Sequence, residues 1–233
     1  MRILFVLLTF FCLISTTTFS QTLNQNGGWL FLMNTTKFNE KWGTHLDVQF
    51  RSADNWEYIR NLMFRPGVTY YINDKNDVTL GYLLNDTYTR LVGVADNRMT
   101  EHRIWQQYIT KHKIGTAAIG HRFRTEQRFI ERRGQSNLFA QRFRYFIRAI
   151  VPVQSGQQKF DKGAFVALQN EVFIHLQNED AAKVFDQNRA YAALGYRFGK
   201  QFDMEAGYLN QTSTGANNYT MNHVMQLALY TRF

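Results

Sequence analysis

The sequence predicts an all-β fold: an antiparallel up-and-down transmembrane β-barrel of about 10 to 12 strands that follows an N-terminal signal peptide. Three observations predict it. An apolar leader begins the chain, apolar and polar residues alternate with a period of two along most of the remainder, and the last alternating segment ends on phenylalanine. After the leader, no stretch approaches the roughly 18 consecutive apolar residues of a membrane helix.

The leader has the composition of a secretory signal peptide. Arg2 precedes an unbroken apolar run, and the small residues Thr18 and Ser20 stand where a signal peptidase cleaves. A transmembrane anchor would need about 20 apolar residues, more than this run supplies. We therefore expect residues 1–20 to be a cleaved signal peptide and residues 21–233 to be one β-barrel domain, located in a bacterial outer membrane.

Cysteine content and charge restrict the chemistry of the mature chain. Cys12 is the only cysteine and lies in the leader, so we expect no disulfide, thiolate nucleophile or cysteine-based metal site. Of the 27 Lys and Arg residues, 26 remain without Arg2, against 18 Asp and Glu, which gives a net charge of +8. In an exported protein this balance favours outer-membrane lipid, lipopolysaccharide or small anions as partners, and no nucleic acid.

Period-two alternation marks successive strands, as where Val78, Leu80 and Tyr82 alternate with smaller or polar residues. Each segment has about 10 to 15 residues, near the length of a tilted strand that crosses a bilayer. Short polar turns alternate with longer polar connections, which is typical of outer-membrane barrels with periplasmic turns and external loops. The predicted strands are 28–37, 43–52, 59–72, 77–90, 99–111, 115–131, 138–151, 163–177, 188–199, 202–213 and 221–233.

These eleven segments conflict with the even strand number of single-chain bacterial barrels. We expect one segment to be split, missed or outside the barrel wall, and 28–37 is the first suspect. If it runs inward from the outside, its polar lead-in at 22–27 must reach the cell surface or enter the lumen. Pro66 interrupts another segment and suggests a bulge.

Aromatic residues and the C-terminus support a membrane barrel. Gly81-Tyr82, Gly195-Tyr196 and Gly207-Tyr208 are each placed near a predicted periplasmic turn, where tyrosines would form an interfacial girdle. The final segment alternates up to Phe233, which resembles the C-terminal signal that the barrel assembly machinery recognises. We therefore expect that machinery to be a partner.

The stretches "LMFRPGVTYYI", "EHRIWQQY", "RFRTEQRF", "QRFRYFIR", "FDQNRAYAALGY" and "GYLNQ" resemble the bacterial outer-membrane barrel family catalogued as domain of unknown function 2490. The resemblance covers nearly all of the mature chain. It implies an outer-membrane barrel and implies no reaction or site residues.

Two arginine-rich runs, "HRFRTEQRFIERR" at 121–133 and "QRFRYFIR" at 141–148, place their charges on one face of a predicted hairpin. A lipid-facing arginine near the membrane midplane costs about 2 to 4 kcal/mol, so this face is expected to line the lumen. Glutamates on the same face can form bidentate pairs with part of the arginines. The predicted lumen cluster is Glu101, Arg103, Arg122, Arg124, Glu126, Arg128, Arg142, Arg144, Arg148, Glu171 and Arg189.

Two interpretations of this cluster remain open from sequence. The charges can form an ion-pair network that fills and rigidifies a narrow barrel. Alternatively, their positive excess can form a small anion-preferring pore.

Other functional classes have weaker support. A lipid-modifying barrel enzyme needs a nucleophile beside a base, and Ser136 near Asn137 is the closest approach, with no histidine fixed beside it. His45 and Asp47 share a strand face but fall short of a metal site. A soluble periplasmic lipocalin-like carrier would have an apolar interior and a polar exterior. We therefore expect no enzyme activity, catalytic residue, metal or cofactor.

Overall fold

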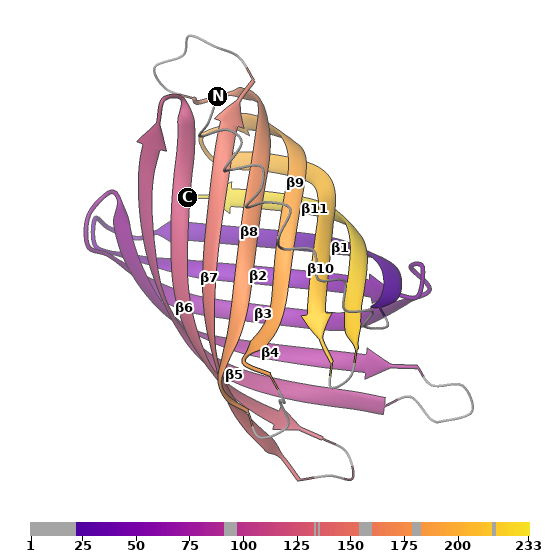
Figure 1. Ribbon diagram of the computed structural model, residues 1–233. Helices are drawn as coiled ribbons and strands as arrows, with labels where there is room; N and C mark the ends of the chain where they lie inside the picture. Colours follow the sequence, from indigo (N-terminus) through magenta and orange to yellow (C-terminus); the bar gives the residue numbers. More distant parts are fainter. Residues whose placement is uncertain are drawn as a thin grey trace, which may run out of the picture.

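The computed structural model describes residues 22–90, 97–132, 134, 136–153, 160–178, 183–215 and 218–233, and these form an all-β barrel (Figure 1). The expected signal peptide at 1–20 lies outside the described residues. Within the described ranges, no helix has the length and apolar character needed to cross a membrane. The strands are β1 (Thr22–Lys37), β2 (Trp42–Ala53), β3 (Tyr58–Tyr71), β4 (Asn76–Thr89), β5 (Asn97–Ile114), β6 (Ala117–Glu131), β7 (Leu138–Pro152), β8 (Gly163–Asn178), β9 (Phe185–Gly199), β10 (Phe202–Thr214) and β11 (Tyr219–Arg232).

The barrel closes through its first and last strands. Each strand pairs antiparallel with the next along the chain, whereas β1 pairs parallel with β11, from Thr22 opposite Tyr219 to Thr35 opposite Arg232. The predicted all-β barrel of about 10 to 12 strands is confirmed, with eleven strands. The expected even strand count is wrong, and the predicted antiparallel pairing is wrong between β1 and β11. An odd number of alternating strands leaves the first and last strands pointing the same way, and parallel pairing still satisfies their backbone groups.

All eleven predicted segments lie in the barrel wall, including the suspected 28–37. The largest boundary error is at β1, which begins at Thr22 because its polar lead-in pairs with β11 instead of forming a separate segment. Pro66 does not mark a bulge. The β3–β4 register is the same from Phe64 opposite Leu84 to Gly67 opposite Gly81, so the proline removes ladder bonds without inserting a residue.

The strands begin and end at the two ends of the barrel (Figure 1). We call the end where β1, β3, β5, β7, β9 and β11 finish the turn end. The opposite end, where β2, β4, β6, β8 and β10 finish and where β1 begins, is the loop end. In Figure 1, β2 and β3 pass behind β7 and β8 with crossing directions, so the two walls enclose a common interior.

Side chains alternate between the interior and an apolar outer face. On β4, Asp77 and Thr79 are buried, whereas Val78, Leu80 and Tyr82 are exposed. The same pattern leaves Leu194, Tyr196 and Phe198 of β9 exposed, along with Met204 and Tyr208 of β10. Large apolar side chains thus cover the outside over strands from both halves of the barrel.

The outward tyrosines do not all lie at one height. Tyr196 is near the turn end, as expected, but Tyr82 and Tyr208 lie near the middle of β4 and β10. The glycines that precede Tyr82 and Tyr196 face inward and make room for interior aromatic rings, whereas a Cβ on Gly207 would meet Ala192 and Ala193. A Cβ on Gly81 would stand 2.1 Å from Trp105, and one on Gly195 would stand 2.3 Å from Phe165. The glycines in these pairs therefore serve interior packing, which sequence reasoning had not assigned to them.

Candidate functional site: an arginine cluster inside the barrel

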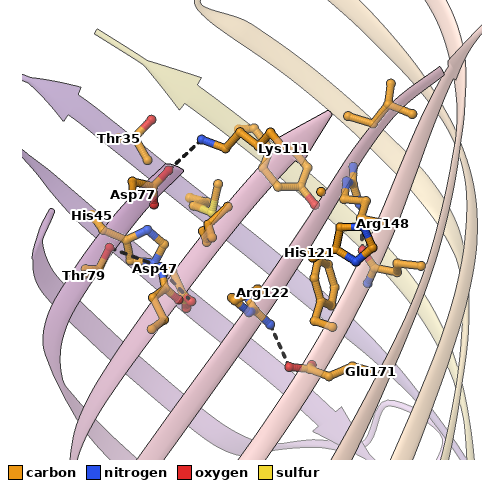
Figure 2. A pocket seen from close by; sticks show the side chains of 18 of the residues that line it. Thr35, His45, Asp47, Asp77, Thr79, Lys111, His121, Arg122, Arg148 and Glu171 are labelled. Carbon is orange, nitrogen blue, oxygen red and sulfur yellow. Dashed lines mark hydrogen bonds and ion pairs between the residues drawn. The ribbon is translucent and has the colours of Figure 1, made fainter. Parts of the chain in front are cut away.

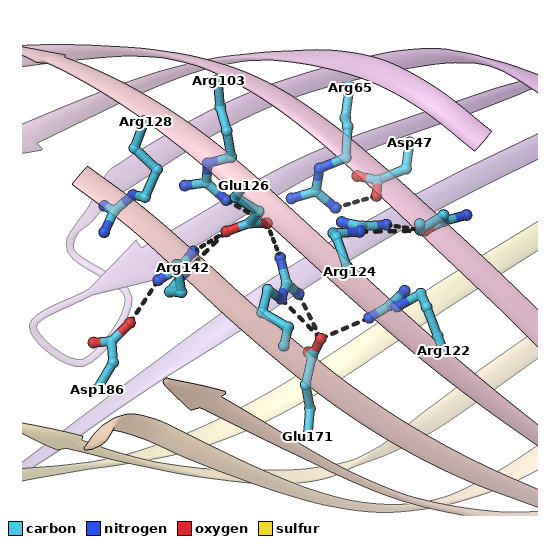
Figure 3. A network of polar contacts seen from close by, with 12 residues as sticks. Asp47, Arg65, Arg103, Arg122, Arg124, Glu126, Arg128, Arg142, Glu171 and Asp186 are labelled. Atoms are coloured by element: carbon cyan, nitrogen blue, oxygen red, sulfur yellow. Dashed lines mark hydrogen bonds and ion pairs between the residues drawn. The ribbon is translucent and has the colours of Figure 1, made fainter. Parts of the chain in front are cut away.

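Ion pairs join strands that are not neighbours in the wall. Arg122 of β6 donates from Nη2 to Glu171 Oε1 of β8 at 2.7 Å, and Arg142 of β7 donates to Asp186 of β9 at 2.7 Å. Arg148 of β7 pairs with Glu205 of β10, three strands away. Side chains on the convex outside of a barrel diverge, so contacts that skip a strand pass through its interior (Figure 3).

One part of this interior is a dense carboxylate-centred network. Glu126, with a fully buried side chain, accepts hydrogen bonds from Arg103 Nη1 at 3.0 Å, Arg142 Nε at 2.9 Å and Arg144 Nη1 at 2.6 Å. Figure 3 shows its carboxylate between the guanidinium groups of Arg103 and Arg142. Glu101 similarly holds Arg103 and Arg128, at 2.8 Å and 2.6 Å. Charge-assisted bonds of this kind satisfy several buried cations with few acids.

Three arginines of the interior have no carboxylate within ion-pair distance among the described residues: the buried Arg51 and Arg124, and the partly buried Arg189. Each instead donates to a glutamine. Arg51 Nη2 donates to Gln49 Oε1 at 2.5 Å, Arg124 Nη2 to Gln107 at 2.6 Å and Arg189 Nη2 to Gln187 at 3.2 Å.

These three guanidinium groups also lie over aromatic rings. The Arg51 guanidinium is 3.8 Å from the ring centroid of Trp29, and that of Arg124 is 4.3 Å from Trp105. Arg189 lies 5.2 Å from the same Trp29 ring. An amide oxygen and a ring face attract a cation but do not neutralise it, so the positive charge of the three groups persists.

A cavity of about 1000 Å³ occupies the turn-end half of the interior. Its lining includes Lys75 and Lys113 of the turn end, so it reaches that end. Figure 2 shows Lys111 reaching Asp77, at 2.8 Å, and Arg122 reaching Glu171. We call its innermost basic residues the arginine floor, which consists of Arg51, Arg65, Arg122, Arg144 and Arg189.

A second, smaller cavity of about 330 Å³ lies at the loop end, lined by residues such as Gln25, Asn61 and Asn222. Trp29 and Arg51 line both cavities. Their stacked side chains therefore stand between the two compartments of the lumen.

One wall of the interior is apolar, which sequence reasoning missed. Phe165, Tyr191, Leu209 and Val224 form a buried cluster, and Trp29 packs against it. The missing signal has a physical cause: β1 is apolar on both faces, as at Trp29-Leu30-Phe31-Leu32-Met33, so its alternation does not show which face is inside.

All eleven residues of the predicted lumen cluster take part in this interior. Arg122, Arg144, Arg148, Glu171 and Arg189 line the large cavity, and the other six belong to the network and its contacts. Sequence reasoning missed Asp47, Arg51, Arg65, Asp186 and Glu205. Asp47 and Arg51 carry a signal in the sequence, since they alternate with Val48 and Phe50 and so share one face of their strand.

The other residues singled out from the sequence, His45 with Asp47, Ser136 and Phe233, do not form a further site among the described residues. His45 Nε2 and Asp47 Oδ2 are 4.0 Å apart, and the described residues contain no group of three or more side chains suited to a metal ion. Ser136 lies in the β6–β7 connection, where its backbone oxygen accepts a hydrogen bond from Arg132 Nε at 3.1 Å. Phe233 ends at the β1–β11 seam, and its backbone N–H donates to Thr35 O at 2.9 Å.

Comparison with known proteins gives two matches. A family model described as protein of unknown function (DUF2490) matches residues 26–222. An uncharacterized protein of Methylorubrum extorquens is 29% identical over 237 residues, which cover 98% of this chain and 97% of that protein. Neither description names a reaction or a ligand.

Proposed function

The chain belongs to the DUF2490 family of proteins of unknown function, and for this member we propose an integral outer-membrane β-barrel whose narrow lumen is closed by its own charged side chains. The observation that carries this proposal is the inverted distribution of polarity. Exposed Leu80, Leu168, Leu194 and Met225 cover the outside, whereas Glu126 and its arginines are buried inside. A soluble barrel that carries a ligand would need the reverse.

Polar groups on the outer face are paired with one another. Gln106 Nε2 donates to Gln127 Oε1 at 3.0 Å, and the Tyr208 hydroxyl lies 2.5 Å from His223 Nδ1. In a bilayer without water, an unpaired polar group costs several kcal/mol, so such pairing suits a lipid-facing surface. The strands, at 12 to 18 residues, also exceed the roughly 9 to 11 needed to cross the hydrocarbon core.

The interior network supports a structural role for most of the predicted cluster. Glu101, Glu126 and Glu171 each hold at least two arginines, so they cross-link β5, β6, β7 and β8 from inside. A closed lumen of this kind keeps a narrow barrel rigid. The proposal includes no reaction and no cofactor.

The proposed location implies three partners: outer-membrane lipid, lipopolysaccharide at the loop end, and the barrel assembly machinery that receives the Phe233-terminated strand. Expression with residues 1–20 in a Gram-negative host tests it. We expect to find the protein in the outer-membrane fraction after a carbonate wash. Its mass should be that of a mature chain that begins at Gln21, and its electrophoretic mobility should change on boiling. Recovery in the soluble periplasm with unchanged mobility would overturn the proposal.

A small anion-preferring pore is the second candidate, favoured by the arginine floor with its unpaired Arg51 and Arg189. Planar-bilayer recordings separate the two. The closed barrel predicts little or no conductance for the wild type, whereas steady wild-type conductance with a reversal potential toward that of chloride would favour the pore.

A further inference from the structure

The large cavity holds more cations than its own acids can pair. Ten Lys and Arg residues line it, against the three acids Asp47, Asp77 and Glu171. Each of these acids already has a basic partner: Arg65 for Asp47, Lys111 for Asp77, and both Arg122 and Arg144 for Glu171. Two more of the ten basic residues, Arg148 and Arg232, pair with Glu205 and Asp203 outside the lining. An anion that enters the cavity therefore meets the positive charge of those without an ion pair among the described residues, which are Arg51, Lys75, Lys113 and Arg189.

The uncompensated charge concentrates at one place. Arg51 and Arg189 lie against the same Trp29 ring, at 3.8 Å and 5.2 Å from its centroid, and they repel each other electrostatically. Both line the cavity. Nearby on the arginine floor, the Nε groups of Arg65, Arg122 and Arg189 have no hydrogen-bond partner among the described residues. Buried cations packed together without anions are costly, and a bound anion would relieve that cost.

An apolar strip leads from this point to the turn end. Phe31 and Met33 follow Trp29 on the inner face of β1, and Tyr230 lies against Phe31 with ring centroids 5.5 Å apart. Leu209 and Ile150 continue the strip on other strands. A lumen that only passes ions is expected to be polar throughout, and a site that binds only an inorganic anion has no use for this surface.

We propose that the cavity binds an amphipathic anion: a carboxylate or phosphate head on Arg51 and Arg189, and an apolar chain along Phe31 and Met33. The cavity volume is at the upper end of the range for small-molecule sites, which suits a ligand of that kind. Lys75 and Lys113 at the turn end attract such a ligand to the entrance. This goes beyond the proposed function and depends only on the barrel interior, not on the membrane location.

Equilibrium dialysis on the refolded full-length barrel in a polymer belt tests the proposal, with labelled octyl phosphate and octanoate as probes below their micellar concentrations. Butyl phosphate and inorganic phosphate measure the contribution of the apolar chain, and octyltrimethylammonium is the matched cation. We expect both octyl anions to bind, affinity to rise about fourfold per added methylene, and the cation not to bind. A preference between octyl phosphate and octanoate identifies the head group.

The variant arm removes the two unpaired charges with Arg51→Gln and Arg189→Gln together. Neither change leaves a carboxylate without its partner, so the barrel is expected to fold. The control removes two charges from the loop end with Arg90→Gln and Lys183→Gln, whose side chains contact the rings of Tyr58 and Tyr219. We expect at least a tenfold loss of octyl phosphate affinity in the first variant and no change in the control.

Equal binding of the octyl cation and the octyl anions would overturn the proposal, as would equal affinity for inorganic and octyl phosphate. Both comparisons use the wild-type barrel and remain decisive even where the variant does not fold. Unchanged affinity in the folded Arg51→Gln and Arg189→Gln variant would overturn the assignment of the head-group site. None of these outcomes depends on membrane fractionation, so the proposed outer-membrane location is tested independently of the proposed ligand.

Discussion

The guanidinium of Arg51 lies 3.8 Å from the ring centroid of Trp29, and these two side chains line both interior cavities. They come from neighbouring strands, since Trp29 of β1 is paired directly with Arg51 of β2. The stacked pair therefore divides the lumen at a point where one substitution on each strand can join the compartments.

We predict that Trp29→Ala combined with Arg51→Ala converts a barrel of little conductance into a conducting one. Removing both side chains joins the cavities of about 1000 Å³ and about 330 Å³, while Arg65, Arg122 and Arg144 still favour anions. Single-channel recording checks this, with Trp42→Ala as the control because Trp42 is exposed at the turn end. Conductance no greater than that of the wild type would contradict the assignment of this pair as the barrier.

Much of the wall was predictable, since period-two alternation depends only on which residues face the outside of the barrel and which face its interior. The way in which the barrel closes, by parallel pairing of β1 with β11, was not predictable. The alternation of 28–37 does not show whether its free edge pairs with the last strand. The pairing with β11 runs from Thr22 to Thr35, so it also includes the polar residues 22–27, which the sequence does not mark as part of a strand. A rule drawn from antiparallel closure then misplaced this strand.

For the candidate site, the sequence predicts which way the arginine side chains point but not which acids they pair with. That Arg122, Arg124 and Arg128 share one face follows from strand periodicity, and the cost of placing arginines against lipid assigns this face to the interior. The partners of Arg142 and Arg148, Asp186 and Glu205, lie two and three strands away and depend on how the barrel curves. Sequence spacing carries no information on that curvature, so the interior acids on β9 and β10 were missed.

Loss of the central carboxylate should destabilise the barrel strongly. Glu126→Gln leaves Arg103, Arg142 and Arg144 with fewer buried counter-charges, and breaking a buried ion pair costs about 3 to 5 kcal/mol. Urea unfolding in lipid vesicles, followed by tryptophan fluorescence, measures the difference. The control is Glu131→Gln, whose side chain is 59% exposed and pairs only with His102 among the described residues; we expect less than about 1 kcal/mol there. Similar effects of the two changes would show that the network is not stabilising.

Replacing either of two arginines that face each other across β6 and β7 should have opposite effects on the stability of the barrel. Arg124 and Arg144 are direct register partners, but Arg144 binds Glu126 and Glu171 whereas Arg124 binds Gln107. Arg144→Met should cost about 3 kcal/mol because two buried carboxylates lose a partner.

Arg124→Met should stay within about 1 kcal/mol of the wild type or be more stable, because it removes a buried cation that no acid pairs with. The same urea titrations compare the two variants. If Arg124→Met were the more damaging, stacking on Trp105, and not ion pairing, would dominate the interior energetics.

The glycine beneath Trp105 should not tolerate a side chain. A Cβ on Gly81 would approach the indole to 2.1 Å, so Gly81→Ala forces the ring or the strand to move, at a cost of about 1 to 3 kcal/mol. Gly120→Ala is the matched control, because a Cβ there meets nothing within 4 Å. Thermal unfolding of both variants checks the difference. We expect Trp105→Phe to restore part of the stability lost in Gly81→Ala, and a failure to do so would place the strain in the backbone.

The terminal residue should separate assembly in the cell from stability of the barrel. Phe233 donates from its backbone N–H to Thr35 O and accepts at its backbone oxygen from Lys37 N–H at 2.6 Å, while the residue as a whole is 63% exposed. Phe233→Ala keeps both backbone bonds, so refolding into detergent and the urea midpoint should match the wild type. If the aromatic ring is what the assembly machinery recognises, the same variant should accumulate less in the outer membrane of the expressing cell.

Deletion of Phe233 removes the seam bonds as well, and it should lower both the refolding yield and the cellular yield. Equal cellular yield of Phe233→Ala and wild type would remove the basis for the recognition signal, whereas the seam bonds would still be tested by the deletion.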